Sequence, residues 1–464
     1  MSGLFGLIEV GKNSLFAHQA ALGVVNHNIA NASTPGYSRQ RITLAAQGSV
    51  LGLFAGVGGG VSVESIERIS NQFIMGQLGR ARADHGEQSA LASGLASLEA
   101  LIGEPVDDTM GDSGLGDVMA DFLSSWQPVI NPELSADPAD LRGLIIEAGR
   151  LLASRFNSLS EGISEQADSL QSQLAAGVAE LNATIESVAE LNRQIADAGI
   201  ADSARSDLED SRQLQLQRLA ELAGADWRTD ENGKLRVYAG GLTLVDGAVG
   251  HPVALEQTGA LGDRCRGARL SMAGGAALPL AEGGELRGLL TLLNEALPGI
   301  LSRLDRLAAH LAAGVNAIHQ SATGDGGGVD VFVGGDAATL AVNPVLLRHP
   351  EMLSLTGVLP DGRDIATAIF ELHGAVLAGE NGLSLEGLYA GMVGELGAQS
   401  ASAQDLSRAA ERLLTGYEEK LESETGVSLD EELAEMMIVQ ASFQAASKVI
   451  TLVDDLLATV LTLL

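Results

Sequence analysis

Apolar side chains recur at steps of three and four residues at both ends of the chain, which is the spacing of one helix face. After Gly426, the C-terminal stripe comprises Leu429, Leu433, Met436, Phe443, Ala446, Ile450, Val453, Leu457, Val460 and Leu464. The N-terminal stripe lasts about three and a half heptads and comprises Leu4, Ile8, Gly11, Leu15, His18, Leu22, Val25 and Ile29. Because a lone amphipathic helix leaves its apolar face in water, each stripe predicts a partner helix.

The N-terminal stripe stops at a turn signal. Asn31 is a candidate C-cap, and Thr34-Pro35-Gly36-Tyr37 fits a type II turn, in which Pro fixes φ and Gly supplies a positive φ. Alternating segments within 37–46 and 57–69 then predict two strands. At the other end, Ser428 and Glu431 predict a capping box that starts the C-terminal helix.

The interior of the chain reads mostly as long helices. We expect helices over 68–101, 206–224 and 286–318, with Pro298 as a candidate kink, and again from about 365 to the C-terminus. Residues 138–199 contain no proline after Pro138 and predict one very long helix or a pair. A single helix of that length would extend roughly 80–90 Å, which suggests a rod or a filament subunit.

Two interior stretches favour strands. Residues 226–283 contain Asn232-Gly233 between alternating segments, a hairpin signal, and residues 324–360 are Gly-rich and strand-like. We therefore predict a mainly α fold with β-rich insertions, in which the N- and C-terminal regions form a long antiparallel helical bundle beside a smaller β-rich outer domain. The predicted parts are an assembly region (1–45 with 426–464), a long-helix rod (46–225 with 284–320 and 365–425) and the β-rich domain (226–283 with 321–364).

Charge and composition narrow the function. The chain has 60 acidic and 28 basic side chains, a net charge of −32, which disfavours nucleic acid as a partner. Its single cysteine, Cys265, excludes an internal disulfide framework. No basic segment precedes the first apolar residues, and no apolar run reaches the roughly 18 residues of a membrane span. By composition alone the chain reads as cytosolic, unless export uses a signal other than a cleaved peptide.

Catalytic signatures are missing from the sequence. GxSxG, HExxH, Walker A and EF-hand patterns do not occur, and the eight histidines are scattered. The acidic residues around the glycines of "GDGGGVDVF" favour a tight turn over calcium binding. We predict no enzyme, no cofactor and no metal site.

The two chain ends resemble the shared signatures of bacterial flagellar rod, hook and hook-associated proteins. The N-terminal match centres on "NIANASTPGYSRQ", and the C-terminal match is "GVSLDEELAEMMIVQASFQAASKVITLVDDLLATVLTLL". Interior segments such as "LGDVMADFLSSWQPVINPE", "RLLASRFNSLSEGI" and "GKLRVYAGGLTLVDG" are similar to the family of hook-associated protein 1, the FlgK type. Residues 250–283 and 320–380 match weakly, and Ser442-Phe443 replaces a bulkier polar–aromatic pair.

The resemblance implies a structural protein of the flagellum that forms a ring between hook and filament. It implies self-assembly, contact with the hook protein and with a second junction protein of the hook-associated protein 3 type, and an export chaperone of the FlgN type on the C-terminal helix. It also implies an extracellular location reached through the flagellar type III apparatus without a cleaved signal. The expected assembly interface consists of Leu4, Ile8, Leu15, Leu22, Val25, Ile29, Asn31, Pro35, Gly36, Tyr37, Arg39, Gln40, Leu433, Met436, Phe443, Ile450, Val453, Leu457, Val460 and Leu464.

Two alternatives remain open at this point. A paralogous hook or distal rod protein would share both end signatures, although the long helix over 138–199 disfavours it. A secreted coiled-coil protein with an undetected enzymatic insertion is disfavoured because the weakly matched middle of the chain shows no catalytic pattern.

Overall fold

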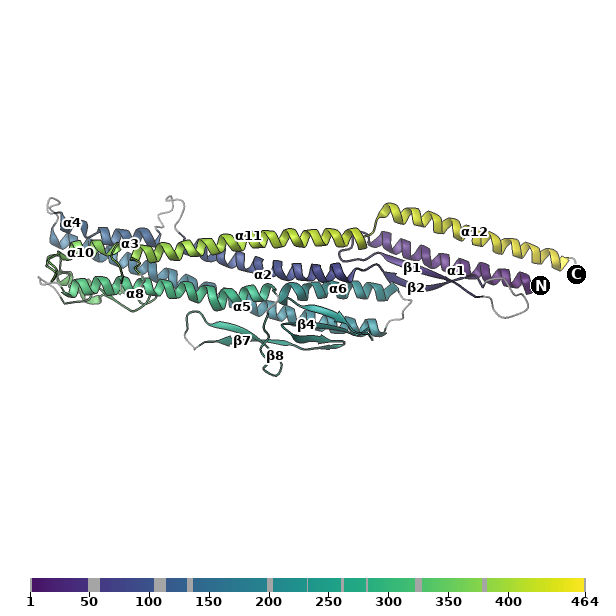
Figure 1. Ribbon diagram of the computed structural model, residues 1–464, viewed down its shortest axis with the longest axis horizontal. Coiled ribbons are helices and arrows are strands. Elements are labelled where there is room, and N and C mark those ends of the chain that lie inside the picture. Colours follow the sequence, from purple (N-terminus) through teal and green to yellow (C-terminus); the bar gives the residue numbers. More distant parts are fainter. Residues whose placement is uncertain are drawn as a thin grey trace.

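The protein is a long rod with both chain ends at the same tip. Figure 1 shows a computed structural model in which bundled helices run along the whole molecule, and the N- and C-termini lie together at one end. The structure describes residues 2–48, 59–103, 114–131, 137–197, 203–231, 233–259, 263–280, 283–321, 328–377 and 382–462. The predicted class, mainly α with β-rich insertions, is confirmed.

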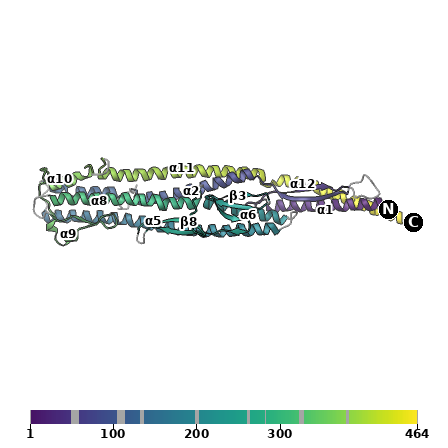
Figure 2. The ribbon, with the colours of Figure 1, turned by 60° about the horizontal axis from the view of Figure 1, so that its bottom comes forward.

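The rod is built from long helices that pack side by side (Figure 2). They are α2 (Gln72–Ile102), α5 (Pro138–Asp197), α6 (Ser203–Ala223), α7 (Glu285–Thr291), α8 (Leu297–Ser321) and α11 (Leu385–Thr425). The long stretch after Pro138 is one helix of 60 residues, because its apolar stripe continues without interruption and is buried from Ile145 to Ile195. Helices α2, α5, α6, α8 and α11 pack against one another and enclose the core.

Pro298 does not break the helical segment that runs from Glu285 to Ser321. A π-helical turn, η2 (Leu292–Ala296), joins α7 to α8 directly before Pro298. Proline has no N–H to donate to the preceding turn, and a π turn is one way in which a helix absorbs such an irregularity. The backbone N–H of Leu297 donates to the carbonyl of Leu292 within this turn.

Six strands lie on the side of α5 near its C-terminal end. They are β3 (Asp226–Thr229), β4 (Leu235–Ala239), β5 (Leu242–Asp246) and β6 (Val249–Gly250) in one antiparallel sheet, and the hairpin β7 (Val253–Thr258) and β8 (Gly267–Met272). The β3–β4 hairpin predicted from Asn232-Gly233 is present, with Gly233 at φ 77°; Asn232 itself lies outside the described residues. Asn182 of α5 holds the sheet region by exchanging hydrogen bonds with the backbone of Val253 at 2.8 Å in both directions.

The far tip of the rod is built from short elements whose buried side chains continue the core of the rod. It contains α3 (Leu115–Ser124), α4 (Gln127–Ile130), β9 (Phe332–Val333), β10 (Ala341–Val342), α9 (Pro344–Arg348), η3 (Pro350–Met352), α10 (Ile365–Phe370) and η4 (Glu371–His373). Phe122 and Phe332 stack edge to face with ring centroids 5.2 Å apart, and Trp126 is fully buried. Asn157 of α5 donates to the carbonyl of Ala337 at 2.7 Å.

The expectation that residues 226–283 and 321–364 form one β-rich domain is wrong. The strands of the first segment pack on the C-terminal half of α5, whereas the second segment packs on the N-terminal half, at the far tip (Figure 1). The two segments meet where Arg264 lies 3.5 Å from Asp336, but they share no sheet. The cause is length: the helical path from Glu285 to Ser321 carries the chain about 55 Å along the rod before the second segment begins.

The terminal unit is the name used below for α1 (Ser2–Asn31), β1 (Gln40–Ala46), β2 (Val61–Arg68) and α12 (Leu429–Thr462). Strand β1 pairs antiparallel with β2, and both contact α1. The predicted domain boundary between 45 and 46 would separate the two strands of this hairpin, so the boundary is misplaced. The chain enters the rod only after β2, because both alternating segments are needed to make the hairpin.

Candidate assembly interface

The two chain ends pair as antiparallel helices. Helix α1 runs toward the rod and α12 runs away from it, and they contact each other along their length (Figure 1). The side chains buried in this pair are small or apolar on α1 and sparse on α12. They are Ala17, Ala21, Val24, Val25 and Asn28 on α1, and Glu432, Val439 and Val453 on α12.

The predicted α1 stripe is displaced by about one position from the buried face. Val25 is buried, but Ile8, Leu15, Leu22 and Ile29 are only half-buried. The sequence pattern followed the largest apolar residues, whereas the helices approach through the small residues Ala17 and Ala21. The side chain of Leu4 lies outside the described part.

The predicted α12 stripe agrees with the structure to a similar extent. Val453 is buried, and Met436, Phe443, Ile450 and Leu457 are half-buried. Leu433 is 48 % exposed and does not belong to the buried face, because its neighbour Glu432 takes that place. Leu464 and the side chain of Val460 lie outside the described residues.

Helix α12 exposes a second apolar face that nothing in the described chain covers. Its members are Leu429, Leu433, Met437, Ile438, Val449, Leu452 and Leu456, with exposed fractions between 42 % and 66 %. By length and composition, the helical stretch Leu385–Thr459 also contains a window apolar enough to cross a membrane, and only 11 % of that window is buried. Such exposure in a monomer marks a surface that binds a partner.

The turn after α1 has the predicted form. The N–H of Tyr37 donates to the carbonyl of Thr34 at 3.2 Å, and Gly36 has φ 78°. The side-chain amide of Asn31, the last residue of α1, donates to the carbonyl of His27, one turn earlier, at 3.0 Å. A Cβ at Gly36 would lie 2.6 Å from Leu214 of α6, so the turn packs tightly on the rod.

Asn28 is the centre of a buried polar network behind this turn. Its amide nitrogen donates to the carbonyl of Gln40 at 2.9 Å and to Glu432 Oε2 at 3.0 Å. Its amide oxygen accepts from the N–H of Gln40 at 2.9 Å and from the hydroxyl of Tyr37 at 2.8 Å. All four hydrogen-bonding positions of a side chain that is 1 % exposed are therefore filled.

Arg39 connects the turn to the last residue of α11 and to the first turn of α12. Its Nε lies 2.6 Å from Glu432 Oε1, its Nη1 lies 2.8 Å from Glu431 Oε2, and its backbone N–H donates to the carbonyl of Thr425 at 2.8 Å. Helix α12 begins at Leu429, where the predicted cap at Ser428 places its start, and the carboxylate of Glu431 binds Arg39.

A cluster of acidic residues on α6 joins the terminal unit to the rod. Asp210 accepts from the N–H of Ser38 and from Arg68 Nη1, both at 2.9 Å, and Gln40 donates to Asp207 at 2.9 Å. Burial raises the pKa of Asp210, and Ser38 and Arg68 counteract the shift by hydrogen bonding its charged form. Burial, reinforced by the neighbouring carboxylates, also raises the pKa of Tyr37, which keeps its hydroxyl protonated as a donor.

Several members of this network were not predicted. Asn28 and Glu432 lie within helical stripes where their neighbours are apolar, and a polar residue at a seam position is the one signal that points to them. Asp207 and Asp210 are about 170 positions from the turn and give no local signal. Of the predicted turn residues, Asn31, Tyr37, Arg39 and Gln40 make side-chain bonds here, whereas Pro35 is exposed and shapes the backbone.

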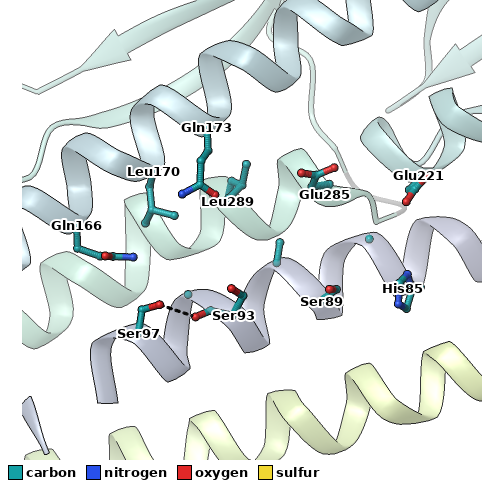
Figure 3. A pocket seen from close by; sticks show the side chains of 13 residues that line it. His85, Ser89, Ser93, Ser97, Gln166, Leu170, Gln173, Glu221, Glu285 and Leu289 are labelled. Carbon is teal, nitrogen blue, oxygen red and sulfur yellow. Dashed lines mark hydrogen bonds between the residues drawn. The ribbon is translucent and has the colours of Figure 1, made fainter. Parts of the chain in front are cut away.

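A polar hollow elsewhere in the rod offers no catalytic arrangement. It has a volume of about 350 Å³ and lies between α2, α5, α6 and α7 (Figure 3). Ser89, Ser93 and Ser97 line one side, and the Ser97 hydroxyl donates to the backbone carbonyl of Ser93 rather than to a base. Within the described residues, no group of three or more His, Cys, Asp or Glu side chains could hold a metal ion.

Models of two protein families match the chain. Residues 104–332 match the flagellar hook-associated protein FlgK helical domain, and residues 422–463 match the C-terminal region of the flagellar basal body rod FlgEFG proteins. The first match covers the rod helices that disfavoured a paralogous hook or distal rod protein, and the second covers α12.

Relatives of the chain carry one name. Flagellar hook-associated protein 1 of Bacillus subtilis is 26 % identical over 98 % of both chains. The proteins of the same name from Salmonella typhimurium and Escherichia coli are 30 % and 28 % identical, over 68 % and 72 % of this chain. This chain covers only 56 % and 61 % of the length of those two relatives.

A solved structure shares the fold. The flagellar hook junction protein FlgK from Burkholderia pseudomallei aligns with a TM-score of 0.62 at 17 % identity, over 76 % of this chain and all of that one.

A helical rod with paired chain ends and an exposed apolar stripe at that tip is typical of assembly proteins. Within that class, the chain belongs to the family of flagellar hook-associated protein 1, the FlgK type.

Proposed function

We propose that this chain is a structural protein of the bacterial flagellum that forms the junction ring between hook and filament. The observation that carries the proposal is the uncovered apolar face of α12, which includes Met437 at 66 % and Ile438 at 62 % exposure. Burying such a face between neighbouring copies stabilises an assembly by roughly 25 cal/mol per Å² of apolar surface. Heterologous contacts of this kind repeat around an axis and generate rings or helical polymers.

The proposed role requires no catalysis. The relatives are flagellar structural proteins, and the side chains of the described rod and terminal unit serve packing and ion pairing. A secreted enzyme on a coiled-coil stalk, the alternative from another class, would need an activated nucleophile, whereas in the hollow beside Ser89 the hydroxyl of Ser97 donates to the backbone carbonyl of Ser93.

The finer partners belong to the proposal. We infer that the ring contacts the hook protein on one side and a second junction protein of the hook-associated protein 3 type on the other. An export chaperone of the FlgN type would cover α12 before secretion, since this helix has the largest exposed apolar surface of the terminal unit. Export through the flagellar type III apparatus would deliver the chain to the outside of the cell.

The test is complementation of a strain that lacks its own junction protein. Expression of the chain should restore filament attachment and motility, and a variant without residues 430–464 should restore neither. If the wild-type chain is expressed and exported and flagellin is still lost to the medium as monomer, the proposed function is wrong.

Circular dichroism of the purified truncated variant provides the control. The rod should keep its helical signal and its melting transition, because its core lies outside the deleted segment. Global collapse of the truncated chain would contradict the view that the terminal unit assembles while the rod stays folded.

A further inference from the structure

The seam between α1 and α12 consists almost entirely of non-directional contacts. Ala17, Ala21 and Val24 on α1 face a helix whose buried apolar residues are Val439 and Val453. Apolar residues repeat along both helices at steps of three and four, so sliding one helix by a turn presents a similar apolar surface. Hydrophobic burial alone therefore leaves the alignment of the two chain ends poorly specified.

Two contacts near opposite ends of the seam agree on one alignment. Asn28 bonds Glu432 near the rod, and toward the outer tip a Cβ at Gly11 would lie 2.7 Å from Ile450 Cγ1. In an antiparallel pair, residue numbers at facing positions have a constant sum, and here the sums are 460 (28 + 432) and 461 (11 + 450). Only the first of these contacts is directional.

Glu432 is bound in a way that a shifted helix would destroy. It is 1 % exposed, and its carboxylate accepts from Arg39 Nε at 2.6 Å and from Asn28 Nδ2 at 3.0 Å. A slip of one helical turn would move the carboxylate about 5.4 Å along the seam, among apolar side chains. A buried charge without its partners is strongly unfavourable, so the shifted alignments are penalised.

We propose that Glu432, held by Asn28 and Arg39, is the register key of the terminal unit: it selects one alignment of α12 on α1. The evidence for this alignment consists of contacts within one chain. Only the explanation of why one alignment is needed rests on the proposed function. Copies in a ring must present the same outer surface, and a slip would displace Ile438 and Leu452 relative to Phe16 on α1.

The test measures the alignment directly in the isolated full-length chain. Spin labels are placed on Gln19→Cys and Lys448→Cys in a Cys265→Ser background, and the distance between them is measured by double electron–electron resonance. Both positions are exposed. With a constant sum of 460, position 19 faces position 441, and residue 448 lies seven positions further along α12, about 10.5 Å along the axis. A slip of α12 by one turn therefore changes the distance between the two labels by several ångströms.

The unsubstituted background should give one narrow distance. The double variant Asn28→Leu/Glu432→Leu removes both polar side chains from the seam, and Tyr37, Arg39 and Gln40 of the turn lose those partners. In this variant a second population displaced by up to about 5 Å should appear. The terminal unit should remain helical in this variant, because leucines restore apolar contact. Glu432→Gln should keep the single distance, since its amide oxygen still accepts from Asn28.

Val439→Ala is the matched control, because Val439 is buried in the same seam and is apolar. It should lower the melting temperature of the terminal unit without adding a second distance. The proposal is overturned if the double variant keeps one unchanged distance. It is also overturned if α1 and α12 of this variant separate altogether, because the network would then hold the two helices together without selecting their alignment. A broad distance distribution in the unsubstituted background would also overturn it. Because no flagellum is involved, these outcomes are independent of the complementation result.

Discussion

The rod and the terminal unit are both built from helices with apolar stripes, yet only one of them is complete as a monomer. In α5, residues such as Leu152, Phe156 and Leu174 are fully buried among neighbouring helices. In α12, the described side chains that reach full burial are Glu432, Val439 and Val453, and the opposite face is exposed. Comparable apolar stripes thus differ in burial, because the rod surrounds its helices with neighbours whereas the terminal unit leaves one helix face exposed to other molecules.

The two regions also differ in how they are held in place. The rod depends on a continuous apolar core, which is insensitive to exact charge. The connection between the rod and the terminal unit depends on polar contacts of Asp207 and Asp210 with Ser38, Gln40 and Arg68, which follow the turn. A polar joint fixes geometry through directional bonds, and this suits an element whose orientation determines how copies stack.

The largest expected effect comes from the same substitution made in both regions. Phe156→Ala removes a fully buried ring from the rod and should lower the free energy of unfolding by about 3–5 kcal/mol. Phe443→Ala on α12 should cost about half of that or less, because its ring is partly in water already. Urea unfolding of the full chain measures both, and equal losses would contradict the contrast between a complete and an incomplete region.

A smaller effect should follow from substituting two glycines of the terminal unit. Gly36→Ala places a side chain at φ 78° and against Leu214, and it should destabilise the turn by about 1–2 kcal/mol. Gly23→Ala is the control: this exposed position within α1 has no neighbour in contact with an added Cβ, and helix propensity favours alanine by up to about 1 kcal/mol. Hydrogen exchange of the α1 amides should show lower protection in Gly36→Ala and higher protection in Gly23→Ala. Lower protection in both variants would refute this account of the turn.

Mild acid should affect the far tip of the rod. His319 is fully buried, its Nδ1 lies 2.7 Å from the carbonyl of Val329, and its Nε2 accepts from the N–H of Ser354 at 2.9 Å. Burial lowers the pKa of His319 below its usual 6.5, so the folded state holds the neutral ring. The unfolded chain then binds the proton more readily, and the stability contribution is present above about pH 6.5 and lost as the pH falls below it.

Thermal unfolding between pH 7.5 and 5.5 measures this effect. The wild-type melting temperature should fall with acid more than that of His319→Gln, in which the position does not titrate. Parallel pH profiles of the two proteins would show that protonation of His319 does not contribute.

The smallest effect on the monomer is expected at the exposed face of α12. Ile438→Asn should change the free energy of unfolding by no more than about 0.5 kcal/mol, since the side chain is 62 % exposed. In the flagellum the same change should weaken incorporation of the chain, as judged by filament loss under shear. Gln444→Asn, also exposed on α12, should leave both properties unchanged. If Ile438→Asn assembles normally, this face is not the interface.

Local patterns in the sequence were sufficient for many elements. The long α5, the strands β1 and β2, the β3–β4 hairpin and the turn at Pro35-Gly36 depend on periodicity and turn chemistry within a few residues. Patterns of this kind failed where the answer depended on distant segments. They joined 226–283 to 321–364 because both are strand-like, although the two segments form separate sheets and meet through side-chain contacts such as Arg264 with Asp336.

The sequence by itself determined that both chain ends are amphipathic helices in need of partners, because the spacing of apolar residues is a local property that survives without any fold. Only the tertiary structure decided which face of each helix is used inside the monomer and which is left exposed. Small residues on α1 allow close approach, and Glu432 meets Asn28 across 404 positions of sequence. That choice depends on three-dimensional proximity of groups with no local relationship, and no stretch of the chain encodes it alone.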